Sequence, residues 1–213
     1  MKNILFCHWQ TMFSPFNVDQ IAIENAFDDV VAAYSSFDRH YHTLEHIHQV
    51  LNAIATLQSY TKNLLSVQLA AWFHDIVYNT QAQNNEEKSA EYAEQLLTSL
   101  GIPLKQIAAV KSLILNTKHH QAARDDFDSQ VLIDADLAIL AANPRQYQEY
   151  SKAIRQEYAW VEESNYITGR TQILKIFLQR DRIYHTPLFC KIGEQAARNN
   201  IQAEIQQLAG YGA

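Results

Sequence analysis

Two adjacent residues, His74 and Asp75, stand inside the most apolar stretch of this chain, residues 64–77. Burying an imidazole and a carboxylate there costs on the order of several kcal/mol unless a partner satisfies both groups. That partner can be an arginine, an internal hydrogen bond or a divalent cation, and a cation satisfies both groups at once. The pair is therefore a candidate for metal ligation.

A second source of ligands is the histidine-rich segment 39–48. At about 100° per residue, a helix here places His46 and His48 on opposite flanks of its apolar stripe, so they cannot both face one site. His46 shares its flank with Val50 and Leu57, which favours His46 over His48 as the inward-facing side chain.

A third source is the apolar segment 131–142, which carries Asp134 and Asp136. In a helix these two side chains point about 160° apart, so a single site uses one of them. A capping or solvent-facing role is a sufficient alternative for Asp134.

Histidine and carboxylate ligands without a thiolate suit Mn²⁺, Fe²⁺, Co²⁺, Ni²⁺, Mg²⁺ or Zn²⁺. The sequence therefore predicts one divalent metal ion, or two, bound by side chains that lie far apart along the chain.

The order and spacing of these residues resemble the HD superfamily of metal-dependent phosphohydrolases. His46 precedes His74 by 28 residues, and Asp75 precedes Asp136 by 61 residues. Longer strings resemble one branch of that superfamily, which is described only as predicted HD phosphohydrolases. They are Arg39-x-Tyr41-His42-x-Leu44-x-His46-Ile47, Trp72-Phe73-His74-Asp75-x-Val77-Tyr78, Asn85-Glu86-x-x-Ser89-Ala90, Asp134-Ala135-Asp136-Leu137 and Gly169-Arg170. The resemblance covers about residues 35–200.

The resemblance implies an all-α HD bundle whose metal ligands are His46, His74, Asp75 and Asp136. Asp136 is chosen over Asp134 because it aligns with the Ala-Asp-Leu string of the family. The implied activity is hydrolysis of a phosphate ester or anhydride in a small molecule, nucleotides included, by water that the metal activates. Asp75 would also orient that water.

One position departs from the family. HD nucleotidases and alarmone hydrolases commonly carry a glutamate three residues after the motif aspartate, where this chain has Tyr78. Glu86, at the start of the next helix, and His42, one turn before His46, are candidate replacements as general acid or base. The departure also favours an alternative, an HD module that binds metal or nucleotide with little or no turnover.

Substrate phosphate needs hydrogen-bond donors and positive charge, for which Arg39, Lys118, His119 and Arg170 are candidates. Arg170 follows Gly169 at an expected helix start, where the helix dipole does not favour arginine, although a salt bridge to Glu162 or Glu163 would also explain it. His119 and His120 can serve instead as ligands of a second ion, and a third alternative, a di-iron HD oxygenase, requires both of them.

Helical spacing of apolar residues runs almost throughout from about residue 17. Only 5 glycines and 4 prolines argue against turn-rich β architectures. The spacing predicts helices at about 21–33, 43–57, 64–77, 84–100, 103–117, 144–161, 166–180 and 188–208, with helix or strand at 131–142. We expect one domain, 1–213, with a motif-bearing core at about 35–142 and a C-terminal helical extension at about 143–210 packed on the same body.

Composition narrows the function classes further. The formal charge of −6 argues against general nucleic-acid binding, which needs clustered Lys and Arg. No G-x-G-x-x-G, G-x-x-x-x-G-K-[ST] or G-x-S-x-G string occurs, and no apolar run approaches a membrane span. Cys7 and Cys190 form no disulfide framework. We therefore expect a cytoplasmic protein whose partner is a small phosphorylated molecule, and a homo-oligomer is compatible with the sequence.

Overall fold

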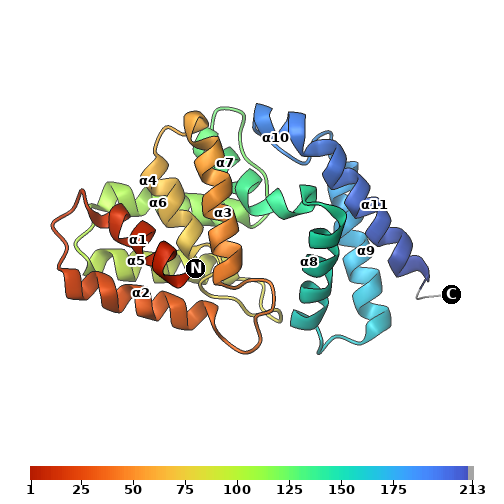
Figure 1. The fold of residues 1–213 in the computed structure, drawn as a ribbon, viewed down its shortest axis with the longest axis horizontal. Helices are drawn as coiled ribbons and strands as arrows, with labels where there is room; N and C mark the ends of the chain where they lie inside the picture. The colour runs from red at the N-terminus through yellow and green to blue at the C-terminus, as the bar shows by residue number, and fades with distance from the viewer. Residues whose placement is uncertain (211–213) are drawn as a thin grey trace.

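The computed structural model of the protein describes residues 1–210, and this part of the chain is all-helical, as predicted, with no strand. Figure 1 shows α1–α7 at one end of the molecule and α8, α9 and α11 at the other. The α-helices are α1 (Lys2–Phe13), α2 (Gln20–Tyr34), α3 (Leu44–Leu57), α4 (Leu64–Phe73), α5 (Asn85–Ser99), α6 (Leu104–Thr117), α7 (Phe127–Asp136), α8 (Pro144–Glu157), α9 (Glu163–Gln179), α10 (Pro187–Ile192) and α11 (Glu194–Gly210). Two 3₁₀ helices are η1 (Gln58–Tyr60) and η2 (Leu137–Ala141).

Helix α4 is the centre of the first group and packs against α3, α6 and α7. Its residues from Leu69 to Phe73 are fully buried, as its apolar composition predicted. Helix α1, which the sequence analysis did not anticipate, packs on it through Trp9, whose ring lies edge-on to Trp72 at 5.2 Å. The Trp9 indole also donates a hydrogen bond of 3.0 Å to the Ile23 carbonyl, which satisfies its one polar atom.

The expected helix over 64–77 is too long, because α4 ends at Phe73. His74 is the C-cap residue, and its backbone N–H donates to Ala70 at 2.9 Å. The chain then turns, and the Arg39 guanidinium donates to the carbonyls of Asp75 at 2.7 Å and Ile76 at 2.9 Å. His74 and Asp75 therefore lie at the end of the buried helix rather than within it.

Segment 131–142 is helical, which excludes the strand alternative. Helix α7 begins after Asp126, whose side chain accepts from the Ser129 backbone N–H, and it ends at Asp136. The chain continues as the 3₁₀ helix η2, which packs against α8 and α11. Asp136 thus stands at the junction between the two groups of helices.

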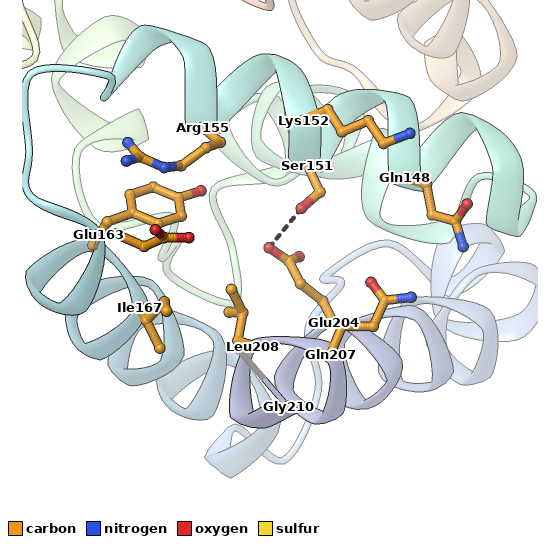
Figure 2. Close-up of a pocket in the computed structure, with 11 residues that line it drawn as sticks. Gln148, Ser151, Lys152, Arg155, Glu163, Ile167, Glu204, Gln207, Leu208 and Gly210 are labelled. Atoms are coloured by element: carbon orange, nitrogen blue, oxygen red, sulfur yellow. Dashed lines mark hydrogen bonds between the residues drawn. The ribbon is translucent and has the colours of Figure 1, made fainter. Parts of the chain in front are cut away.

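The C-terminal helices pack on η2 and on one another. The helix predicted over 188–208 is interrupted at Gly193, where a Cβ atom would lie 3.0 Å from the Tyr184 ring. Buried Arg170 of α9 pairs with Glu204 of α11 at 2.8 Å. Figure 2 shows Glu204 also accepting a hydrogen bond from Ser151 of α8, at 2.8 Å, beside a hollow between α8, α9 and α11.

Among residues 1–210, no helix combines the length and the apolar character that crossing a membrane requires.

Candidate metal centre

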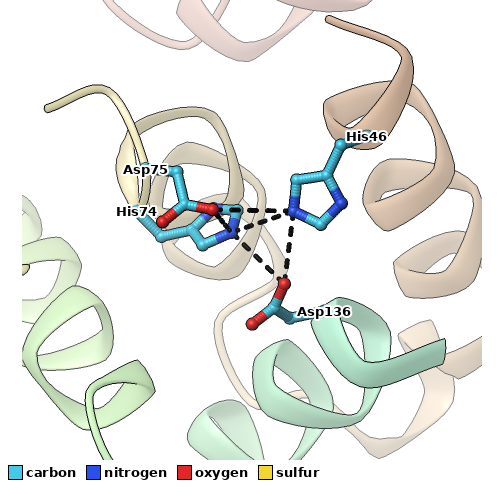
Figure 3. Close-up of side chains that lie close together, drawn as sticks. All are labelled: His46, His74, Asp75 and Asp136. Atoms are coloured by element: carbon cyan, nitrogen blue, oxygen red, sulfur yellow. Dashed lines mark hydrogen bonds and ion pairs between the residues drawn. The ribbon is translucent and has the colours of Figure 1, made fainter. Parts of the chain in front are cut away.

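Four side chains from three separate segments converge on one point (Figure 3). His46 comes from α3, His74 and Asp75 from the end of α4, and Asp136 from the end of α7. One ligand atom from each residue lies within 4.8 Å of all the others. These are the four residues that the sequence singled out, and within residues 1–210 no other group of three such residues comes as close together.

Most of the distances between these atoms fit ligation of a single ion. Two atoms that each lie about 2.0–2.2 Å from one ion, at 90–110° to each other, are about 3.0–3.4 Å apart. The His74 Nε2 atom lies 3.0 Å from Asp75 Oδ2 and 3.4 Å from Asp136 Oδ1. The His46 Nε2 atom lies 3.3 Å from His74 Nε2, 3.2 Å from Asp136 Oδ1 and 3.7 Å from Asp75 Oδ2.

A hydrogen bond beside the cluster prepares His74 for ligation. Its Nδ1–H donates to the Ala71 carbonyl at 2.9 Å. This fixes the ring orientation and leaves the Nε2 lone pair directed at the other three ligands, the arrangement typical of metal-bound histidine. The donor set and its supporting contact therefore fit a divalent cation.

The charges of the cluster compensate one another within a buried site. Burial disfavours protonated His74, but the carboxylates of Asp75 and Asp136 outweigh burial and raise the pKa of His74 well above its usual value. Burial likewise disfavours ionised Asp136, but His74 and hydrogen bonds from neighbouring histidines lower its pKa well below the usual value. Burial lowers the pKa of His46. A cation bound here would take over the role of the histidine protons in balancing the negative charge of the two carboxylates.

Asp134 is buried and takes no part in the cluster. Its carboxylate accepts hydrogen bonds from the backbone N–H groups of His185 and Thr186, at 2.8 and 2.7 Å, and from the Thr186 hydroxyl at 2.6 Å. Asp134 therefore holds the segment before α10 against α7, and the two aspartates point in different directions, as helix geometry predicted.

His120 lies at the cluster, whereas His119 does not. The His120 Nε2 atom is 3.1 Å from Asp136 Oδ2, and its backbone has a φ of +47°. Arg180 donates to the carbonyls of His119 and His120, both at 2.9 Å, and so supports this unusual conformation. The His119 side chain is exposed, so the expected substrate contact from His119 has no support in its position.

His42 approaches the cluster from the other side and is held by Glu157. Its Nε2 atom lies 3.8 Å from Asp75 Oδ2, while its Nδ1 atom lies 2.7 Å from Glu157 Oε2. Burial opposes protonation of His42, but Asp75 and Glu157 outweigh burial and raise its pKa. Burial also opposes ionisation of Glu157, but hydrogen bonds from His42 and nearby backbone lower its pKa to about 2.

Glu157 is the site residue that the sequence analysis missed. It is the last residue of α8 and belongs to no recognisable string, so only its position in space marks it. Tyr78 donates from its hydroxyl to Glu157 Oε2 at 3.0 Å. A carboxylate from α8 is thus in direct contact with the side chain of Tyr78.

Three cationic residues expected at the substrate already have partners. Arg39 is buried, and its guanidinium donates to carbonyl groups of the chain. Lys118 pairs with Glu87 of α5. Arg170 makes two hydrogen bonds to Glu204, and it lies in the second turn of α9 rather than at a helix start.

A cavity of about 440 Å³ opens beside the cluster. It reaches from His42, His74, Asp75, His120 and Asp136 to side chains of α8 and α9. Glu86, a candidate acid or base, and Arg170 both line it, whereas Arg39, Lys118 and His119 do not.

No protein-family model, curated protein or solved structure matches this chain.

Proposed function

We propose that this protein belongs to the HD superfamily and is a metal-dependent enzyme that hydrolyses a phosphate ester or anhydride in a small molecule. The observation that carries the proposal is the convergence of His46, His74, Asp75 and Asp136 at distances that suit one divalent cation. Mn²⁺, Fe²⁺, Co²⁺, Ni²⁺, Mg²⁺ and Zn²⁺ all accept this ligand set. A cytoplasmic location and a small phosphorylated partner are parts of the same proposal.

A divalent cation in this position would lower the pKa of a water molecule and neutralise charge on phosphoryl oxygens. The chain's own groups would orient the reactants. Asp75 lies between His74 and His42, so its carboxylate can accept a hydrogen bond from a water molecule at the cluster. Glu86 lines the same cavity and is the other carboxylate within reach of a substrate there.

His42 supplies the proton-transfer group in this proposal. Its Nδ1–H donates to Glu157, which fixes the ring and leaves Nε2 on the side of Asp75. The Nε2 atom can then accept a proton from water or donate one to a leaving oxygen. This pair replaces the glutamate that the family commonly has at the position of Tyr78.

The test is a metal analysis of the purified chain followed by phosphate release from a panel of phosphoesters and nucleotides with Mn²⁺, Co²⁺ or Mg²⁺. Release that is abolished by a chelator and by Asp75→Ala supports the proposal. A chain that binds no divalent metal contradicts it, and so does phosphate release that a chelator leaves unchanged.

The second candidate is a non-catalytic HD module, which Tyr78 favours because the usual carboxylate is missing. Stoichiometric metal without release from any substrate would support that module. The di-iron oxygenase has less support, since His119 is exposed, and it would require two bound irons and oxygen consumption.

A further inference from the structure

The cavity beside the metal centre is walled by aromatic rings close to the cluster itself. The ring of Tyr78 lies 4.2 Å from the His42 ring, and the ring of Phe177 lies 6.1 Å from the His120 ring. Tyr150 reaches the same wall and packs edge-on against Tyr41 at 4.7 Å. A group attached directly to a phosphate at the cluster would therefore meet aromatic surface.

The apolar character continues away from the cluster. Side chains from η2, α8, the segment after α8, and α9 form this part of the wall, namely Leu137, Ile139, Leu140, Ile154, Val161 and Ile173. Cavities of this size that are lined mainly by apolar and aromatic side chains, with a few polar groups, are typical of sites for small molecules.

Positive charge is scarce in this cavity. Among its lining residues in the described part of the chain, Arg170 is the one lysine or arginine. Its guanidinium is neutralised by two hydrogen bonds to the Glu204 carboxylate, at 2.8 and 3.1 Å. Glu86 adds a negative charge to the wall. A second or third phosphate group would therefore lose its hydration without gaining a cationic partner.

From these contacts we infer that the substrate is a phosphate monoester of an apolar alcohol, either aromatic or aliphatic. This inference rests on the proposed hydrolase function. The single phosphate lies at the four-ligand cluster, and the apolar body lies against Tyr150, Ile154 and Phe177. Water forms the new P–O bond, the P–O bond to the alcohol breaks, the alcohol oxygen takes up a proton, and inorganic phosphate leaves.

The first experiment compares kcat/KM for five substrates with the Mn²⁺-loaded protein. Phenyl phosphate and hexyl phosphate carry an apolar alcohol, whereas glycerol phosphate, AMP and ATP do not. Burial of a phenyl or hexyl group predicts a preference of about 10- to 100-fold for the first two substrates. Equal or higher kcat/KM with glycerol phosphate, AMP or ATP overturns the inference.

A pair of variants on one helix tests the location of the apolar body. Ile173 lines the cavity and is 51% exposed, while Ile176 is 49% exposed and lies outside it. We expect Ile173→Arg to lower kcat/KM for phenyl phosphate about tenfold, mainly through KM, and to improve turnover of ATP. Ile176→Arg, the matched control, should change neither value, and an equal effect of both variants would contradict the location.

An equilibrium measurement separates this inference from the proposed function. Phenylphosphonate and methylphosphonate carry a similar anionic group and are not hydrolysed. Calorimetry, with and without Mn²⁺, should show that phenylphosphonate binds at least about tenfold more tightly than methylphosphonate. We expect Ile173→Arg to reduce this difference in affinity. If this preference holds but no phosphate ester is hydrolysed, the hydrolase function fails and the cavity assignment stands. Equal affinity for the two phosphonates overturns the cavity assignment.

Discussion

Glu157 Oε2 lies 2.7 Å from His42 Nδ1, although 115 residues separate the two in the chain. The other carboxylate oxygen accepts hydrogen bonds from three consecutive backbone N–H groups, those of His40, Tyr41 and His42, at 2.7–2.9 Å. One buried side chain of α8 therefore fixes both the loop before α3 and the ring that faces Asp75. Through this contact, a residue of the C-terminal helices positions His42 beside the metal-ligand candidate Asp75.

We expect Glu157→Gln to act on the position and protonation of His42. Loss of the carboxylate should reduce kcat by about tenfold or more with a small change in KM, because general acid–base groups contribute about 10²–10⁴-fold. Burial opposes protonation of His42, and Glu157 helps to raise its pKa against that effect. The variant should therefore move the His42 limb of the pH–rate profile to lower pH.

Glu149→Gln is the matched control for this measurement. Glu149 lies on the same helix, pairs with Arg145 at the surface and should leave the profile unchanged. A profile that shifts equally in both variants, or in neither, would contradict a positioning role for Glu157.

Asp134 and Asp136 should give opposite results when each is replaced by Asn. We expect Asp136→Asn to weaken metal binding by about 100-fold or more while the chain stays folded, because one ligand of the cluster loses its charge. Asp134→Asn should keep the metal and lower the free energy of unfolding by about 1–3 kcal/mol, because hydrogen bonds to a buried carboxylate are weakened. Metal titration and urea unfolding measure the two effects, and loss of metal in the Asp134 variant alone would refute the assignment.

His120 should be required for activity but not for stability. Its Nε2 contact with Asp136 is a charge-assisted hydrogen bond, so His120→Asn should lower kcat/KM by about 10- to 100-fold. Asn tolerates the positive φ at this position, so the melting temperature should stay within a few degrees of the parent value. Full activity in the variant would show that His120 has no role in the reaction.

The buried Arg170–Glu204 pair should make stability depend on pH. Burial opposes ionisation of Glu204, but Arg170 outweighs burial and lowers the Glu204 pKa below its usual value. The resulting stabilisation is present at pH values above the unfolded carboxyl pKa and is lost as the pH falls through the lower folded pKa. Glu204→Gln should cost about 3–5 kcal/mol at pH 7, because it leaves Arg170 buried without a charge partner.

Urea unfolding at pH 7 and at pH 3 tests this coupling. The difference in the free energy of unfolding between the parent and Glu204→Gln should shrink at the lower pH, because Glu204 takes up a proton more readily in the unfolded chain than in the folded one. A difference that is the same at both pH values would mean that the charge of Glu204 contributes nothing.

Much of the fold followed from local patterns in the sequence. Apolar spacing predicted α2, α3, α5, α6, α8 and α9 because each buries one stripe of side chains, and that stripe repeats at the helical period. The end of α4 was misplaced because Ile76 and Val77 continue the apolar pattern. The chain instead turns after Phe73, where Arg39 donates to the carbonyls that follow. The last predicted helix is interrupted at Gly193, where the nearby Tyr184 ring leaves little room for a side chain, and no local pattern reveals that contact.

Some residues of the centre could likewise be found from the sequence, whereas others could be found only from the tertiary structure. Residue type and apolar surroundings were enough to single out His46, His74, Asp75 and one of the two aspartates at 134 and 136, because metal ligands need particular donor atoms and buried charge needs an explanation. The choice of Asp136 rested on the resemblance to the HD superfamily. The contact of Glu157 with His42 and the pairing of Arg170 with Glu204 became visible only in the tertiary structure. Each residue acts through a partner in a distant segment, and packing of the C-terminal helices is the physical event that brings these partners together.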